Sequence, residues 1–402
     1  MNEGRDQARL KWLTCLMFLM FAMTSDAVGS VIPRVLEEYK LSLKAASAFH
    51  YAPMIAIAIG ALSLGFLADR LGRRRTIVLG LALYGVSSLL FAVGNVFVQF
   101  VALLAVAGLG ISVFKIGALA LIGDISRNNA EHTRLMNTVE GFFGVGAIIG
   151  PAIVALLLTT GFSWKWLYVC AAVICFVLLA VALAARYPAV KDQGTEPINL
   201  ARTLRLMRDP YALGFSLLIM LYVAVEVAIY VWMPTYLEDY HGSHAWLPLY
   251  ALTLFFVLRA AGRFMAIWLL RRFRWNHILA VFGLAIFGCF GGSLWFGVDA
   301  GAWLLPASGL FMSMIYPTLN SKGISGFRPD EHGAVAGVIL FFTAVAAAVG
   351  PLAMAAVSDA GGSLRNGFAL ATAFAAMLAL GLVYNGLADP AAARLARRTE
   401  PA

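Results

Sequence analysis

The chain alternates between long apolar runs and short polar breaks. A run of about 20 apolar residues is long enough to cross a hydrocarbon core about 30 Å thick, and such runs recur throughout the 402 residues. The pattern predicts twelve membrane-spanning helices, six before and six after the one long interior polar segment, 187–210. The predicted spans are 10–36, 46–68, 76–95, 99–123, 135–159, 166–186, 212–237, 246–270, 276–296, 302–325, 332–358 and 366–387.

The two sets of six spans are related to one another in sequence. Pro33, near the end of the first span, recurs as Pro234 near the end of the seventh, 201 residues later. Gly150 in the fifth span recurs as Gly350 in the eleventh, 200 residues later. Duplicated six-helix halves are a common plan for secondary transporters, with the binding site between the halves. We therefore predict two halves in parallel orientation and a cytoplasmic linker, with boundaries at 1–186, 187–210 and 211–402.

Composition and charge support a membrane location. Hydrophobic residues make up 61% of the chain and charged residues 13%, whereas soluble domains carry about 25% charged residues. If the chain starts in the cytoplasm, 21 of its 30 lysines and arginines fall in cytoplasmic segments. This asymmetry places both termini in the cytoplasm. The net charge of +9 follows from this asymmetry and indicates no nucleic-acid partner. The opposite side holds five cations, at Arg34, Lys40, Lys44, Lys165 and Arg365.

A charged turn joins the second and third predicted spans. The stretch Gly65-x-Leu-Ala-Asp69-Arg70-x-Gly72-Arg73-Arg resembles the signature loop of the major facilitator superfamily. The resemblance implies an all-α fold of two pseudo-symmetric six-helix halves that transports by alternating access. We interpret Asp69 as a gate that holds the cytoplasmic side closed, and the arginines from Arg73 onward as positive-inside anchors. The gating loop is predicted to comprise Gly65, Asp69, Arg70, Gly72 and Arg73.

Three stretches, 137–147, 221–236 and 311–318, resemble the fucose–proton symporter family of sugar permeases. This resemblance implies symport of a sugar with protons. The chain differs from that family where Val113 stands at the acidic position of the fourth helix and Glu140 at a polar position of the fifth. These differences permit a charged substrate. The glycines at 141–150 also resemble a motif of drug–proton antiporters, although small residues at this spacing mainly let helices approach closely.

Ionisable residues inside the predicted spans are the main candidates for function. Insertion scales give a cost of about 2.5–3.5 kcal/mol for such a residue at a helix centre, so each requires a partner or water. Burial disfavours the charged form of a carboxyl, which makes Asp26 and Glu226 candidate proton carriers. Lys115 and Glu140 can form an ion pair, which is either functional or purely structural. The candidate substrate and proton residues are Asp26, Lys115, Glu140, Glu226, Arg259, Tyr316 and Asn320.

The sequence contains no constellation typical of an enzyme. It has no phosphate-binding glycine loop followed by Lys-Ser or Lys-Thr. Its six histidines lack metal-ligand spacing, and His50 is interpreted as interfacial packing at the outer start of the second span. We therefore expect no metal, no cofactor and no catalysis, with the proton gradient as the energy source.

Three functions remain open from the sequence. The first is proton-coupled symport of a small polar solute, sugar or sugar-like, across the cytoplasmic membrane by a monomer embedded in the bilayer. The second is proton-coupled efflux of an amphipathic compound or organic ion. The third is a non-transporting receptor or scaffold, which would have little use for ionisable residues inside its spans.

Overall fold

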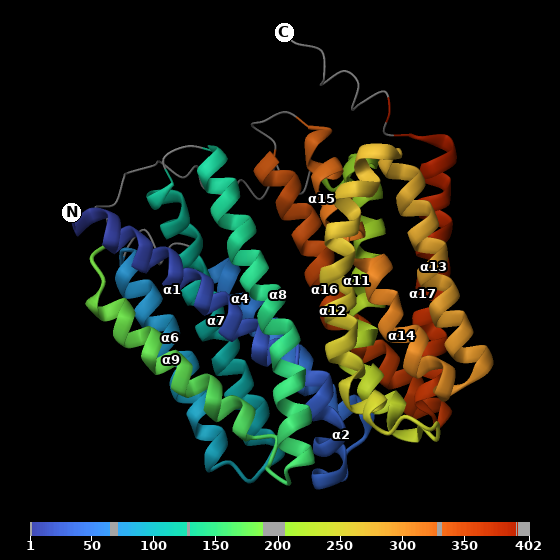
Figure 1. Ribbon diagram of the computed structural model, residues 1–402, viewed down its shortest axis with the longest axis horizontal. Helices are drawn as coiled ribbons and strands as arrows, with labels where there is room; N and C mark the ends of the chain where they lie inside the picture. The colour runs from blue at the N-terminus through green and yellow to red at the C-terminus, as the bar shows by residue number, and fades with distance from the viewer. Residues whose placement is uncertain are drawn as a thin grey trace. The chain divides into compact units, whose positions relative to one another are not determined.

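A computed structural model describes residues 2–64, 71–126, 129–187, 206–327, 332–390 and 392. Throughout this part of the chain the regular structure is helical, and twelve helical segments are long and apolar enough to cross a membrane (Figure 1). The prediction of an all-α protein with twelve candidate spans is confirmed. The chain divides into two compact units, Met1–Gln193 and Gly194–Ala402, and each is described by itself.

The N-terminal unit is a bundle in which α1 packs lengthwise against α8, α4 packs against α7, and α6 lies between α7 and α9. Its main helices are α1 (Asn2–Ser25), α2 (Val28–Tyr39), α3 (Leu43–Ala46), α4 (Ala48–Ser63), α6 (Arg73–Leu89), α7 (Phe97–Ile125), α8 (Asn129–Thr159) and α9 (Trp166–Ala184).

The C-terminal unit repeats this arrangement. Here α11 packs against α16, α12 against α14, and α13 against both α14 and α17. Its main helices are α11 (Pro210–Tyr236), α12 (Trp246–Arg272), α13 (Trp275–Phe296), α14 (Val298–Met312), α15 (Ile315–Ser325), α16 (His332–Gly361) and α17 (Leu364–Ala388).

Close helix contacts recur at the same sequence offset in the two units. A Cβ on Gly60 of α4 would overlap Ser112 of α7, and a Cβ on Gly262 of α12 would overlap Ser313 at the end of α14. These pairs are related by 202 and 201 residues, the offset seen in the sequence. The two units therefore share their internal packing as well as their helix order.

A second shared contact joins a cation to a backbone carbonyl. Lys165, just before α9, donates to the carbonyl of Gly94 at 3.3 Å, and Arg365, in the first turn of α17, donates to the carbonyl of Leu294 at 2.9 Å. The two donors, Lys165 and Arg365, are 200 residues apart in the sequence, and so are the two acceptors, Gly94 and Leu294. Each unit thus ties the start of its last helix to the end of its third.

Two helices that the sequence predicted to be continuous are broken. The first span is interrupted at Asp26 and Ala27, between α1 and α2, and the tenth at Ser313 and Met314, between α14 and α15. Pro317 explains the second break, because its ring clashes with the carbonyl four residues earlier and it donates no hydrogen bond there. At the first break, the Thr24 hydroxyl donates to the carbonyl of Phe21, a local bond that competes with the helix ladder.

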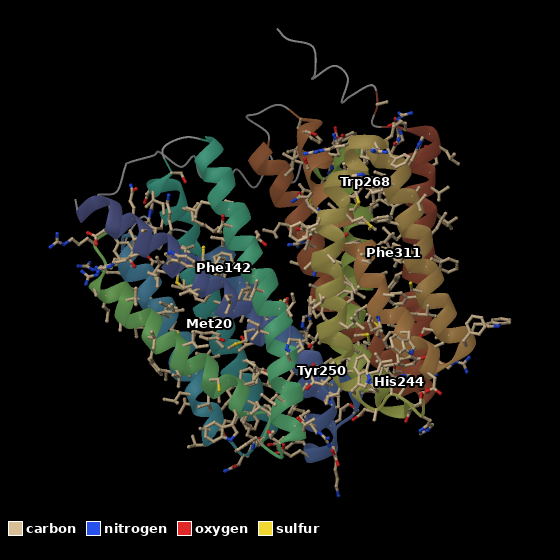
Figure 2. The ribbon with its side chains drawn as sticks, in the orientation of Figure 1. Met20, Phe142, His244, Tyr250, Trp268 and Phe311 are labelled. Carbon is tan, nitrogen blue, oxygen red and sulfur yellow. The ribbon has the colours of Figure 1, made fainter. Side chains whose placement is uncertain are left out.

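The outward helix faces carry large apolar side chains (Figure 2). Trp268 is 53% exposed and Phe264 is 77% exposed, whereas Met20 is fully buried inside the N-terminal unit. Monomeric soluble proteins rarely expose contiguous apolar patches of large size. The pattern is that of helices surrounded by lipid.

The glycine run of α8 serves helix packing. A Cβ on Gly150 would overlap the carbonyl oxygen of Met23 on α1, so no side chain fits there without movement of the backbone. At the equivalent Gly350 of α16 a Cβ would meet Ala224 at ordinary contact distance, 3.5 Å from its Cα, and on Gly141 it would meet nothing within 4 Å. The packing interpretation therefore holds at Gly150, where the approach of α8 to α1 depends on the missing side chain.

Gly150→Ala is expected to lower stability by about 1–3 kcal/mol, because overpacking against a backbone atom forces α1 and α8 apart. Gly350→Ala is the matched control: it gives the same gain in helix propensity without the overlap, and it is expected to stabilise the protein by up to about 1 kcal/mol. Thermal unfolding of the purified protein in detergent measures both. Equal midpoints for the two variants would contradict the packing argument.

Candidate functional site

In the C-terminal unit, two candidate residues predicted from the sequence meet as a buried ion pair. Glu226 lies in the middle of α11 and Arg259 in the middle of α12, and the Arg259 guanidinium contacts Glu226 Oε1. The side chains are 10% and 20% exposed, respectively. A charge inside a span needs a partner, and here each residue is the partner of the other.

Tyr222 extends this pair to the break between α14 and α15. It lies one turn before Glu226 on α11, and its hydroxyl is 3.0 Å from Glu226 Oε1 and 3.0 Å from the carbonyl oxygen of Met312. Met312 is the last residue of α14. A hydroxyl has one proton, so Tyr222 cannot fully satisfy both acceptors while Glu226 is ionised. The state of the Glu226 carboxyl thereby affects a hydrogen bond at the end of α14.

The two polar candidates of α15 lie on one face of that short helix. Tyr316 follows the break directly and its ring lies 6.2 Å from that of Tyr222. Asn320 is one turn further along α15, and both side chains are half-buried. Tyr316 therefore lies beside Tyr222, whose hydroxyl contacts Glu226.

In the N-terminal unit, Asp26 occupies the break between α1 and α2. It is half-buried, and Ser25 Oγ donates to its Oδ1 at 3.0 Å. Lys115 on α7 places its ammonium over the rings of Phe18 and Phe21, at 5.2 and 4.8 Å from their centroids. An aromatic face attracts a cation at such distances.

Lys115 and Glu140 do not form the ion pair that the sequence allowed. Among the described residues the Lys115 ammonium has no carboxylate oxygen within 4.0 Å, although the charges of Glu140 and, more weakly, Asp26 act on it at longer range. Glu140 is exposed on α8. The aromatic rings of α1, and not a carboxylate, make the direct contacts to Lys115.

At one pair of equivalent positions, the two units carry side chains of different chemistry. Phe21 and Lys115 correspond to Tyr222 and Tyr316 at the 201-residue offset. The first pair makes a cation–π contact and the second a contact between two rings. The N-terminal unit therefore offers a cation where the C-terminal unit offers hydroxyls and a paired carboxylate.

The predicted gating loop falls partly outside the described residues, which do not include Gly65, Asp69 and Arg70. Gly72 is described and has a φ of 79°, a conformation that favours glycine. Arg73, interpreted as a positive-inside anchor, also forms a buried ion pair. Its Nε donates to Asp124 Oδ2 at 2.8 Å, with side chains only 9% and 5% exposed.

Three polar residues that make buried contacts in the structure were not identified from the sequence: Asp124, Thr24 and Tyr84. Asp124 at the end of α7 was not recognised, because nothing in the sequence links it to Arg73. Thr24 Oγ1 and the Tyr84 hydroxyl are 2.8 Å apart, and the polar run Thr24-Ser25-Asp26 inside an apolar span was the available signal. His50, interpreted as packing at the outer start of the second span, is buried in the first turn of α4, with 1% of its surface exposed.

The described residues contain no group of three or more His, Cys, Asp or Glu side chains that could hold a metal ion. The candidate residues described above offer an ion pair, hydroxyls and aromatic faces. Such groups are suited to binding a polar solute and to gaining or losing protons.

Comparison with known proteins gives consistent results. A model described as the Major Facilitator Superfamily matches residues 14–351. The chain is 23% identical over 389 residues to the L-fucose-proton symporter of Escherichia coli, covering 88% of this chain and 87% of that protein. It is 25% identical to the 4-hydroxybenzoate transporter PcaK of Pseudomonas aeruginosa, but that match spans only 59% of this chain and 60% of that protein. The crystal structure of the nucleoside transporter NupG superimposes with a TM-score of 0.75 at 15% identity, covering 95% of this chain and 98% of that one.

Proposed function

The chain belongs to the Major Facilitator Superfamily, and on that premise we propose that it moves a small polar solute, sugar or sugar-like, by proton-coupled symport. Proteins of this superfamily are secondary transporters and not enzymes. The chain is a multi-pass membrane protein with twelve candidate spans, and we place it in the cytoplasmic membrane. Transport is by alternating access.

One observation carries the coupling proposal: Glu226 has a partner in either protonation state. When ionised, it pairs with the Arg259 guanidinium. When protonated, it can donate to the Tyr222 hydroxyl, whose own proton then goes to the Met312 carbonyl. The carboxyl can thus exchange a proton without being left as an unpaired buried charge, which would be costly.

The same hydrogen bonds join proton exchange to the backbone at a helix break. Broken helices near the middle of the membrane form the binding sites of many transporters. Protonation of Glu226 strengthens the bond of Tyr222 to Met312, and the Tyr222 ring lies beside that of Tyr316 on α15. A solute bound against Tyr316 would contact this same segment, and symport requires it to bind more tightly when Glu226 is protonated. This cooperativity is the basis of the proposed coupling.

A sugar-like substrate is supported by two features. The L-fucose-proton symporter of Escherichia coli aligns across both units of the chain. The half-buried Tyr316 and Asn320 offer an aromatic face and an amide, the groups that orient polar rings in binding sites.

A second candidate is transport of an organic acid, including proton-coupled efflux. It is favoured by Lys115, which lies over Phe18 and Phe21 without a direct carboxylate contact among the described residues. A cation flanked by aromatic rings suits an aromatic carboxylate, and one relative is a 4-hydroxybenzoate transporter.

Uptake into proteoliposomes with an imposed proton gradient tests these proposals. Symport predicts that inward protons drive inward accumulation of a neutral sugar from a panel that also contains 4-hydroxybenzoate and nucleosides. Accumulation of the acid alone would favour the second candidate, and outward flux against inward protons would show antiport. Flux driven by a sodium gradient, or no gradient-dependent flux for any solute, would overturn proton symport. Collapse of the gradient with a protonophore is the control.

A further inference from the structure

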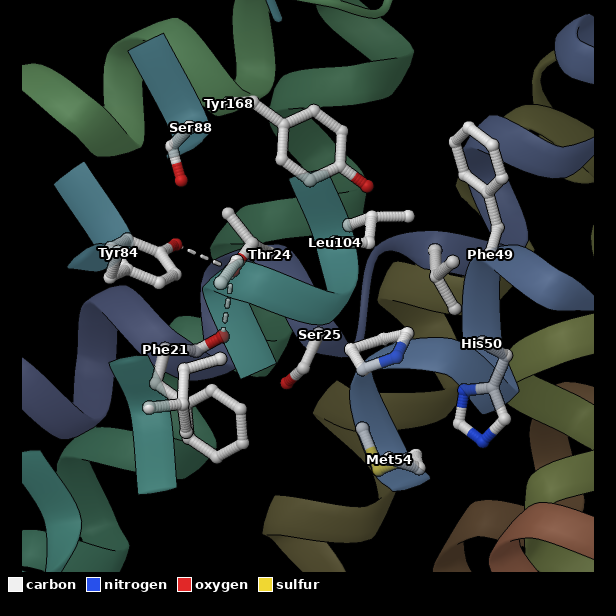
Figure 3. A pocket seen from close by; sticks show the side chains of 14 residues that line it. Phe21, Thr24, Ser25, Phe49, His50, Met54, Tyr84, Ser88, Leu104 and Tyr168 are labelled. Atoms are coloured by element: carbon white, nitrogen blue, oxygen red, sulfur yellow. Dashed lines mark hydrogen bonds between the residues drawn. The ribbon is translucent and has the colours of Figure 1, made fainter. Parts of the chain in front are cut away.

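A small cavity lies inside the N-terminal unit, between the end of α1 and helices α4, α6, α7 and α9 (Figure 3). The volume open to the centres of water molecules is ≈ 30 Å³. Most of the lining is apolar. The polar side chains that face the cavity are Thr24, Ser25, His50, Tyr84, Ser88 and Tyr168.

The hydroxyl groups of this lining have hydrogen-bonding capacity that a bound polar ligand could use. Figure 3 shows the hydrogen bond between Thr24 and Tyr84, 2.8 Å long, at one end of the cavity. The Tyr168 hydroxyl makes no hydrogen bond with any described residue, and Tyr168 is only 3% exposed. Buried hydroxyls in native proteins nearly always have a partner, and ordered water is the usual one when protein groups are absent.

The C-terminal unit shows that the fold itself does not require these hydroxyls. At the offsets of 200–202 residues that relate the units, four of the six polar side chains are replaced by apolar ones, and all four replacements are buried. Phe290 and Phe368 contact one another there, with ring centroids 6.3 Å apart. The replaced residues are Thr24 by Val225, Tyr84 by Ile286, Ser88 by Phe290 and Tyr168 by Phe368.

The size and chemistry of the cavity identify its ligand. A volume of ≈ 30 Å³ is enough for about two water molecules. The lining offers hydroxyl groups and a histidine ring but no carboxylate, so it does not suit a cation. We propose that the cavity is an internal water site, in which bound water joins the Tyr168 hydroxyl to the Thr24–Tyr84 pair and to Ser25.

Ser25 connects this water site to the helix break. Its hydroxyl lines the cavity and donates to Asp26 Oδ1 at 3.0 Å, which leaves its oxygen able to accept from a water molecule. The site thereby places water one side chain away from a carboxyl inside the span. This link matters for transport only if Asp26 takes part in the proposed proton coupling, and to that extent it rests on the proposed function.

Hydroxyl-radical labelling by X-ray radiolysis of the full-length protein tests the water site directly, because radicals formed from bound water modify the side chains beside it. Tyr168 and Tyr84 are expected to be labelled several-fold faster than Phe368, a buried aromatic residue at the position equivalent to Tyr168. This comparison needs no variant. Labelling of Tyr168 and Tyr84 as slow as that of Phe368 would overturn the proposal.

A double variant provides a second test of the water site. Thr24→Val with Tyr168→Phe installs the residues of the C-terminal unit and removes two of the hydroxyls that would hold the water. Labelling of Tyr84 is expected to fall to the level of Phe368, and unchanged labelling would contradict the site. Proton-coupled uptake by this variant is expected to fall several-fold, and unchanged uptake would overturn the link to Asp26. Absence of coupled uptake in the wild type would count against symport and leave the labelling result standing.

Discussion

Glu226→Gln is expected to reduce proton-coupled uptake to background while counterflow exchange of the same solute continues. Glutamine preserves the shape of the side chain and can hydrogen-bond with Tyr222, but it cannot bind and release a proton. It also leaves Arg259 without its carboxylate partner. Exchange requires only that the loaded protein reorient, whereas net uptake driven by protons requires a titratable group.

Proteoliposomes loaded with unlabelled solute measure exchange, and an imposed proton gradient measures coupled uptake in the same preparation. Glu37→Gln is the matched control, because Glu37 is a surface acid with a 71% exposed side chain paired to Arg34. This control is expected to behave as wild type in both assays. Coupled uptake by Glu226→Gln at the wild-type rate would remove Glu226 from the mechanism.

Arg73→Met is expected to destabilise the N-terminal unit by about 3–5 kcal/mol, because it leaves the Asp124 carboxylate buried without its partner. The two side chains are 9% and 5% exposed and join the start of α6 to the end of α7. The double variant Arg73→Met with Asp124→Leu removes both charges and is expected to recover most of the loss.

Thermal and denaturant unfolding of the two single variants and the double variant form a cycle that isolates the pair. Arg34→Met serves as the surface comparison, since an exposed pair contributes about 0–1 kcal/mol. An Arg73→Met variant no less stable than Arg34→Met, or a double variant no more stable than the singles, would contradict a buried structural pair.

Much of the fold could be predicted from the sequence because the membrane imposes simple rules. The length of an apolar run indicates a span, and markers such as Pro33 and Pro234 reveal the duplication. The breaks at Asp26 and Ser313 were not predicted, because an apolar run with a proline or a short polar stretch remains long enough to span. The breaks in these two helices are evident only from the backbone structure.

The candidate site was predicted residue by residue but not as a set of contacts. Ionisable side chains inside spans are conspicuous in a sequence, so Asp26, Glu226 and Arg259 were identified. Their partners depend on how helices pack, which the sequence does not reveal. Helix packing pairs Glu226 with Arg259 and sets Lys115 against aromatic rings in place of the expected Glu140.

The recurring contacts within each unit have a consequence for biogenesis. Each unit contains its own glycine contact between its second and fourth spans, and its own bond from Lys165 or Arg365 to a backbone carbonyl. Domains generally fold as units during synthesis, the N-terminal one first. Both of these contacts lie within the first six spans, so we expect them to form in the bilayer while the ribosome is still translating the last six.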